Sequence, residues 1–206
     1  MNYDEQKNFF ETAYKTGSDL WTDKLYHSKI LEYISLLPAN SLTLDLGSGR
    51  GRLSFAMAEM GLRVIGLEYI ESLTEINNTE VQAKNLEGKI KFVAGDALEI
   101  AFADTSFDAV TDFELLQHLH REDWPKYSSE INRVLKPGGH VLTVCLSKET
   151  ESFYDFAPSQ SIEGDYEKYG VFFHFFTPAE LAKVYGDNFK IIKQETFYLE
   201  KERENL

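Results

Sequence analysis

Short apolar runs alternate with amphipathic segments along most of this chain. The runs predict strands, and the segments between them carry apolar residues at the spacing of a helix face. The expected strands are residues 41–46, 63–67, 90–94, 107–112, 140–146 and 189–198, and the expected helices are residues 5–15, 22–37, 52–60, 72–85, 122–135 and 177–185. Strands that alternate with helices are typical of parallel pairing through crossover connections. The chain therefore predicts an α/β fold, a doubly wound and mainly parallel sheet with helices on both faces.

Two short sequence signals predict where particular helices and strands begin or end. Thr177 and Pro178 stand where a helix would have its N-cap and first residue. The sequence Lys-Pro-Gly-Gly at 136–139 predicts a turn that ends one helix and begins a strand. At 206 residues the chain is long enough for one domain.

Charge and composition exclude several classes of partner and site for this chain. Its formal charge is −13, from 34 acidic and 21 basic residues, and no cluster of Lys and Arg offers a phosphate backbone a basic stripe. We therefore expect no nucleic acid partner. The only cysteine, Cys145, lies in an apolar run and is expected in the core, so neither a disulfide framework nor a multi-cysteine metal site is expected. No apolar stretch reaches the ~18 residues of a membrane span, and the polar residues 1–6 do not resemble a signal peptide, so we expect a cytoplasmic protein.

A glycine-rich turn follows the first expected strand. Gly47, Gly49 and Gly51 stand between that strand and a helix, where free N–H groups and small residues allow a ligand close to the backbone. Glu68 ends the next strand, 21 residues after the first glycine, in the place of an acid that accepts hydrogen bonds from ribose hydroxyls. The pattern predicts a nucleotide-like ligand at the carboxyl ends of the strands, and a purely structural turn is the alternative.

The glycine spacing separates two kinds of nucleotide site. A dinucleotide fingerprint requires its third glycine at position 52, where this chain has Arg52. The turn also lacks the Lys-Ser/Thr pair of a P-loop. A nicotinamide-dependent oxidoreductase is thus the weaker alternative.

Five segments in order resemble the class I S-adenosylmethionine-dependent methyltransferases, whose fold is Rossmann-like. The resemblance covers about residues 40–146 and is carried by residues 44–51, by Glu68, and by residues 95–97, 107–119 and 135–142. It implies methyl transfer from S-adenosylmethionine, with S-adenosylhomocysteine as product. In the family the cofactor is held by residues that correspond here to Asp45, Gly47, Ser48, Gly49, Gly51, Glu68, Tyr69, Asp96, Ala97, Phe113 and Glu114. For Asp96, a cap of the following turn is the alternative.

The same resemblance points to groups around the acceptor. His118 follows the fourth strand, and His174 precedes the last helix; each is a candidate base, with a structural or positioning role as the alternative. Residues 173–181 are similar to a segment of small-molecule members, including tellurite-resistance-type methyltransferases, where it borders the acceptor. By the same analogy Tyr14, Trp21 and Phe173 would contact the acceptor or cover the cofactor.

The resemblance also divides the chain. Residues 1–38 would form an N-terminal helical cap, and residues 39–206 a methyltransferase domain. Nine aromatic residues within positions 153–176 predict an aromatic lid at about 147–176, or else a loop that packs onto the domain. Family members end in a strand hairpin, whereas only residues 199–206 follow the last expected strand here. Two alternatives follow: the chain is cut short and the final antiparallel strand is missing, or the edge of the sheet is finished in another way.

The acceptor expected from these signals is a small molecule. Residues 111–114 read Thr-Asp-Phe-Glu and not the Pro-Pro-aromatic loop of amino-group methyltransferases, and no Pro-Cys nucleophile is present. The atom that receives the methyl group and the oligomeric state stay open. The other alternative is a domain of the same fold that binds a cofactor or partner without turnover.

Overall fold

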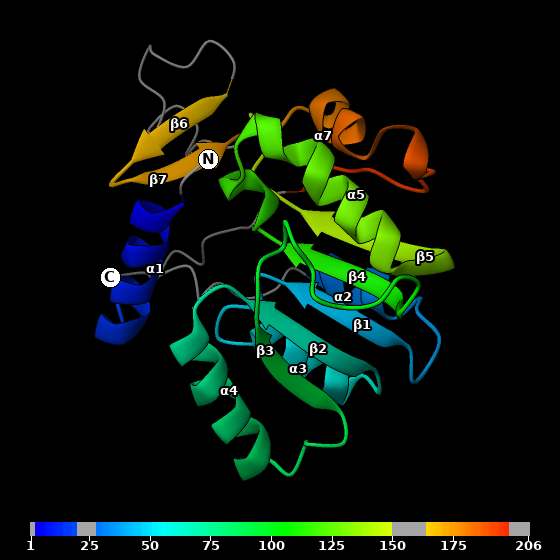
Figure 1. Ribbon diagram of the computed structural model, residues 1–206. Helices are drawn as coiled ribbons and strands as arrows, with labels where there is room; N and C mark the ends of the chain where they lie inside the picture. Colours follow the sequence, from blue (N-terminus) through cyan, green and yellow to red (C-terminus); the bar gives the residue numbers. More distant parts are fainter. Residues whose placement is uncertain (1–2, 20–27, 150–163, 198–206) are drawn as a thin grey trace, which may run out of the picture.

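A computed structural model describes residues 3–19, 28–149 and 164–197. Its centre is a five-stranded sheet formed by β1 (Leu42–Leu46), β2 (Arg63–Glu68), β3 (Ile90–Ala94), β4 (Phe107–Phe113) and β5 (Leu135–Val144). All neighbouring strands pair in parallel, in the order β3-β2-β1-β4-β5 (Figure 1). The expected doubly wound architecture is confirmed, and the chain reverses its strand order between β1 and β4.

Helices cover both faces of this sheet and divide its core in two. One cluster joins side chains of α2 (Ser28–Ile34), α3 (Arg52–Glu59) and α4 (Glu71–Ala83) to the sheet. The other joins α5 (Trp124–Val134) and α7 (Pro178–Tyr185) to it. Helix α7 begins as expected: Thr177 is its N-cap in a capping box with Glu180, and Pro178 is its first residue.

Two elements lie at the carboxyl edge of the sheet rather than on a face. Helix α1 (Asp4–Thr16) contacts a small antiparallel hairpin of β6 (Asp165–Lys168) and β7 (Val171–His174) (Figure 1). The expected N-terminal cap is therefore divided in space, because α1 lies at this edge whereas α2 packs into the core. Three short 3₁₀ turns, η1 (Leu116–His118), η2 (Arg121–Asp123) and η3 (Gly186–Asn188), complete the described elements.

The expected strand at 189–198 is wrong over its described part, residues 189–197, which form no strand. Side chains hold this segment against α2: Glu195 accepts hydrogen bonds from Lys29 and Tyr33, and the Lys193 ammonium lies 4.7 Å from the Tyr33 ring centre. A groove of about 2480 Å³ is lined by both this segment and β5. Contacts between side chains have thus replaced a backbone ladder.

Two further expectations need correction. Residues 136–139 are not a free turn but part of β5, with a register shift opposite Phe107 and Ala109. Position 139 accepts only glycine, because a Cβ there would lie 2.9 Å from the Asp108 carbonyl oxygen. The β6–β7 hairpin falls inside residues 147–176, which were expected to form a lid or a loop.

Within the described ranges, no helix has the length and apolarity to cross a membrane.

Candidate functional site

The glycine turn after β1 has the tight geometry that its sequence predicts. Gly47, Gly49 and Gly51 all have positive φ, at 63°, 52° and 73°. At Gly51 a Cβ would lie 2.4 Å from the Phe92 ring, so packing also excludes a larger residue. The Ser48 N–H donates to the Leu67 carbonyl at 3.1 Å, which fixes the turn beside the end of β2.

Glu68, at the end of β2, holds this turn in place. Its Oε2 accepts from the Gly49 N–H at 2.8 Å, and its Oε1 accepts from the Ile70 N–H at 3.1 Å. The side chain is 7% exposed, and burial raises its pKa. Glu68 is therefore a buried carboxyl group that already orders the loop beside which the cofactor was expected.

Asp45 lies beneath the loop, on the side of the sheet that faces α3. Its carboxylate accepts from Ser54 Oγ at 2.6 Å and from Thr111 Oγ1 at 2.8 Å, and so it links α3 to β4. Burial raises the pKa of Asp45 to about 6.

Asp112, near the end of β4, was given no role by the sequence analysis. It is 1% exposed and accepts from the Leu115 N–H at 2.8 Å, the Leu116 N–H at 3.0 Å and the Tyr127 hydroxyl. Burial raises its pKa to about 7. The signal that could have revealed this role is the position of Asp112, an acidic residue near the end of an apolar strand. Asp112 was considered only as part of residues 111–114.

Asp96 follows β3 and caps its own turn. Its Oδ1 accepts from the Leu98 N–H at 2.7 Å, and the neighbouring Ala97 is buried. This bond is the turn cap that was the alternative for Asp96. A contact of Asp96 or Ala97 with an adenine ring stays a prediction.

Helix α1 covers the glycine turn from outside the sheet. A Cβ at Gly49 would lie 3.1 Å from the Tyr14 hydroxyl. The Arg50 guanidinium donates to both oxygens of Asp19, at 2.6 and 2.7 Å, and to the Tyr14 carbonyl at 2.9 Å. These contacts of Arg50 were not predicted, since nothing in one sequence indicates which distant carboxylate an arginine meets. Trp21 lies outside the described residues.

The remaining expected cofactor residues lie around the same edge. Glu114 has a φ of +68° and donates its N–H to the Val144 carbonyl at 2.8 Å, and Phe113 before it is partly buried in the α2–α3 core. Tyr69, directly after β2, is 42% exposed, with the Lys7 ammonium of α1 4.3 Å from its ring centre. The structure thus brings Tyr69 to α1 and gives Glu114 a strained backbone beside β5.

His118, in η1, contacts both α1 and the hairpin. Its Nδ1 is 2.8 Å from the Phe172 carbonyl oxygen, and its Nε2 is 3.4 Å from Gln117 Nε2. The rings of Phe10 and Phe173 meet it edge-on, with centroids at 5.3 and 4.7 Å. Of the two candidate bases, His118 is the one that is half-buried at the carboxyl edge.

His174, at the end of β7, is fully buried. Its Nδ1 is 2.5 Å from Asp165 Oδ1, and burial lowers its pKa. The Trp124 and Phe176 rings pack on it at 4.9 and 4.3 Å. This geometry favours the positioning alternative, in which His174 ties the two strands of the hairpin to α5.

The residues at this edge fit a cofactor that carries a ribose and positive charge. Carboxyl groups lie one residue before the end of β1, at the end of β2 and after β3, beside a loop whose three glycines have positive φ. Ser48 Oγ is buried in the loop without a hydrogen-bond partner among the described residues. Carboxylates suit hydroxyls, an ammonium and a sulfonium, and an orphaned hydroxyl beside them is ready to bind a polar group.

Comparison with known proteins names the domain. Residues 44–143, from β1 to β5, match the family model described as a methyltransferase domain. This stretch is a methyltransferase domain, similar to the class I S-adenosylmethionine-dependent methyltransferases. The resemblance read from the sequence is thereby confirmed, apart from its narrower link to tellurite-resistance-type methyltransferases, which stays a prediction.

Relatives of this methyltransferase domain carry several small-molecule names. Demethylmenaquinone methyltransferase of Lactobacillus johnsonii is 29% identical over 143 residues, which cover 68% of this chain and 54% of that protein. Sterol 4-C-methyltransferase strm-1 of Caenorhabditis elegans is 30% identical over 128 residues, or 62% of this chain and 37% of that protein. The chain thus spans about half the length, or less, of the curated relatives it matches.

A solved structure shows the same fold. Burkholderia thailandensis 1,6-didemethyltoxoflavin-N1-methyltransferase, with bound 1,6-didemethyltoxoflavin and S-adenosylhomocysteine, aligns with a TM-score of 0.68 at 22% identity. The alignment covers 88% of this chain and 74% of that one. At this identity the likeness concerns the fold, which is the Rossmann-like methyltransferase fold.

Proposed function

We propose that this protein transfers a methyl group from S-adenosylmethionine to a small-molecule acceptor. The observation that carries the proposal is the meeting of the glycine turn, Glu68 and Asp45 at the carboxyl edge of β1 and β2, within a methyltransferase domain. The relatives' names, which include a quinone and a sterol methyltransferase, agree with a small acceptor. A cytoplasmic site of action is part of this proposal.

The carboxyl groups and the turn would hold the cofactor, whose sulfonium supplies the methyl group. Glu68 would accept from the ribose hydroxyls with the lone pairs that the Gly49 and Ile70 N–H groups leave. Asp96 would accept from the adenine amino group. Tyr14, on α1, lies over the Gly49 backbone and would cover the bound cofactor from solvent.

The hydrogen bonds of His118 fix the tautomer of its neutral ring. A carbonyl oxygen only accepts, so the 2.8 Å contact with Phe172 places the proton on Nδ1. The Nε2 atom then carries a lone pair. Gln117 Oε1 accepts from the Leu146 N–H at 2.8 Å, which directs its amide N–H groups toward that lone pair. The 3.4 Å contact with Gln117 is long, and an acceptor hydroxyl or amine that replaces Gln117 at Nε2 would give its proton to this lone pair, so we assign His118 the role of the base.

The β6–β7 hairpin and helix α1 would close the acceptor side. Gln6 of α1 donates to the His118 carbonyl at 3.1 Å and accepts from the Phe172 N–H at 3.0 Å. Phe173 packs on His118, and this contact supports a place for Phe173 on the acceptor side. Such closure excludes water from the transferring methyl group. Residues 150–163 of the expected lid lie outside the described residues.

A turnover assay with methyl-labelled S-adenosylmethionine and a panel of phenols, aromatic amines and thiols tests the proposal. We expect label in at least one acceptor, and a drop of about tenfold at neutral pH in His118→Asn, which cannot take a proton. A tenfold effect is smaller than the ~10²–10⁴-fold usual for a general base, because an acceptor that is already partly ionised depends less on a base. If no acceptor in the panel gained label, the result would contradict methyl transfer. Equal turnover by wild type and His118→Asn would show that His118 is not the base. The affinity of His118→Asn for S-adenosylhomocysteine serves as the folding control.

A further inference from the structure

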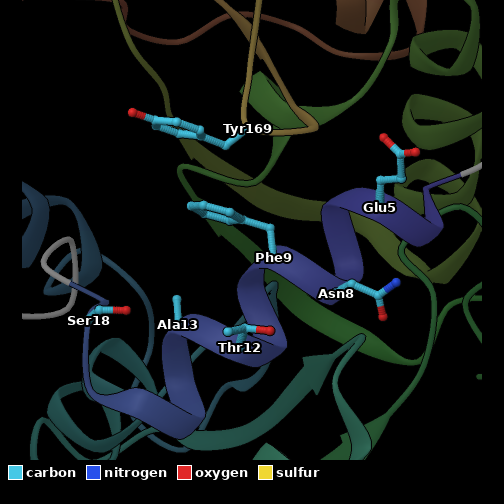
Figure 2. Close-up of a pocket in the computed structure, with 7 residues that line it drawn as sticks. All are labelled: Glu5, Asn8, Phe9, Thr12, Ala13, Ser18 and Tyr169. Carbon is cyan, nitrogen blue, oxygen red and sulfur yellow. The ribbon is translucent and has the colours of Figure 1, made fainter.

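A second hollow lies outside the cofactor edge, between α1 and the tip of the β6–β7 hairpin. Its volume is about 370 Å³, and its walls are side chains of α1, of Ser18 shortly after that helix and of the hairpin turn (Figure 2). The residues that line it are Glu5, Asn8, Phe9, Thr12, Ala13, Ser18 and Tyr169. We call this hollow the α1 slot. It is large enough for a small ring system.

Two parallel aromatic rings bound the slot. The Phe9 and Tyr169 planes are 2° apart and their centroids 6.4 Å apart, and Figure 2 shows both rings projecting to the same side, above Ala13. Tyr169 is 76% exposed and has a φ of +57°. This conformation is costly for a tyrosine, and such outliers cluster at ligand sites. The strained turn presents an exposed ring face parallel to that of Phe9.

The two sides of the slot are fixed relative to each other. The Gln6 side chain bonds both to Phe172 in β7 and to His118, so α1 is tied to the hairpin. At Gly170 a Cβ would lie only 3.3 Å from Glu5, which shows how closely the hairpin turn approaches the helix. The slot is therefore preorganised, and a ligand need not order its walls.

A series of aromatic contacts joins the slot to the base assigned above. Phe9 meets Phe10 edge-on at 5.6 Å, Phe10 meets His118 at 5.3 Å, and His118 meets Phe173 at 4.7 Å. A ring bound against Phe9 thus lies next to the residues that position His118.

The rim of the slot selects for charge. Glu5 supplies an exposed carboxylate at one end and Ser18 a hydroxyl at the other, with the Asn8 amide and the Thr12 hydroxyl between them (Figure 2). Aromatic faces attract cations, and the Lys168 ammonium already lies 5.3 Å from the centroid of the Tyr169 ring, so the charge that the slot offers to a ligand is the Glu5 carboxylate. We propose that the α1 slot binds a flat aromatic cation beside the residues that position His118, an inference that rests on the methyl transfer proposed above for the role of that histidine.

Protonated 2-aminoquinoline is a suitable probe, since it is flat, cationic at pH 6.5 and fluorescent. We expect a saturable fluorescence titration with wild type. Phe9→Leu and Tyr169→Leu, which keep apolar volume and lose a ring face, should each weaken binding at least fivefold, and Glu5→Gln should weaken it about threefold. Decahydroquinoline, a bicyclic cation without a flat ring, should bind at least tenfold more weakly.

Tyr33→Leu, on α2 and remote from the slot, is the matched control and should bind the probe like wild type. S-adenosylhomocysteine should bind all variants equally and should not displace the probe. Failure of wild type to bind, equal affinity in the Phe9 and Tyr169 variants, or displacement by S-adenosylhomocysteine would overturn the α1 slot. Failure of S-adenosylhomocysteine to bind wild type, with probe binding intact, would instead overturn the proposed methyl transfer.

Discussion

Glu68→Ala is expected to lower the affinity for S-adenosylhomocysteine about a hundredfold. The substitution removes a carboxylate that would accept from the ribose hydroxyls, and charge-assisted hydrogen bonds contribute ~1.5–3 kcal/mol each. It also leaves the Gly49 and Ile70 N–H groups without their acceptor, so the glycine turn loses its anchor. Calorimetric titration of the folded variant measures the loss.

Two further variants separate charge from geometry at this position. Glu68→Gln keeps the shape and one acceptor oxygen, so its affinity should lie between wild type and Glu68→Ala. Glu71→Ala removes an exposed carboxylate from the first turn of α4 and should leave the affinity unchanged. Wild-type affinity in a folded Glu68→Ala protein would place the cofactor elsewhere.

The second large effect is a loss of stability with rising pH that depends on Asp112. Burial raises the pKa of this carboxyl to about 7, whereas an unfolded aspartate titrates near 3.9. At a pH between 3.9 and about 7, Asp112 of the folded chain holds a proton that the unfolded chain has released. The free energy of unfolding therefore falls as pH rises from 4 to 7. The contribution of Asp112 is on the order of 4 kcal/mol.

Asp112→Asn tests this contribution, because an amide does not titrate. Urea unfolding of both proteins from pH 4.5 to 8 should show that wild type loses stability relative to the variant as pH rises. Asp45, whose pKa is raised to about 6, and His174, whose pKa is lowered, act with opposite signs in this range, but both proteins contain them. Parallel pH profiles would mean that Asp112 is ionised in the folded protein throughout.

The parts of the fold set by short-range pattern were predictable. The strand from Leu42, the glycine turn and the helix behind it lie within residues 42–59, where apolar spacing and glycine placement decide the conformation. The same is true of the Thr177–Pro178 helix start. Local pattern thus gave the central sheet and the loop beside it.

The errors arose where distant contacts decide the outcome. Residues 189–197 have the composition of a strand, yet Glu195 and Lys193 bind α2 from more than 150 residues away. The hairpin at 165–174 was not predicted, because aromatic residues occur both in strands and in loops that pack onto a domain. Arg50 and Asp112 gained their roles from Asp19 and Tyr127, partners that spacing along one chain does not reveal.

Calorimetric titration of the purified protein with S-adenosylhomocysteine, with NADH as the control ligand, tests the central claim most directly. The proposed function predicts micromolar binding of S-adenosylhomocysteine and no heat with NADH. Binding of NADH alone would contradict the assignment based on Gly51 and Arg52. A folded protein that binds neither ligand would contradict a functional cofactor site at the carboxyl edge of β1 and β2.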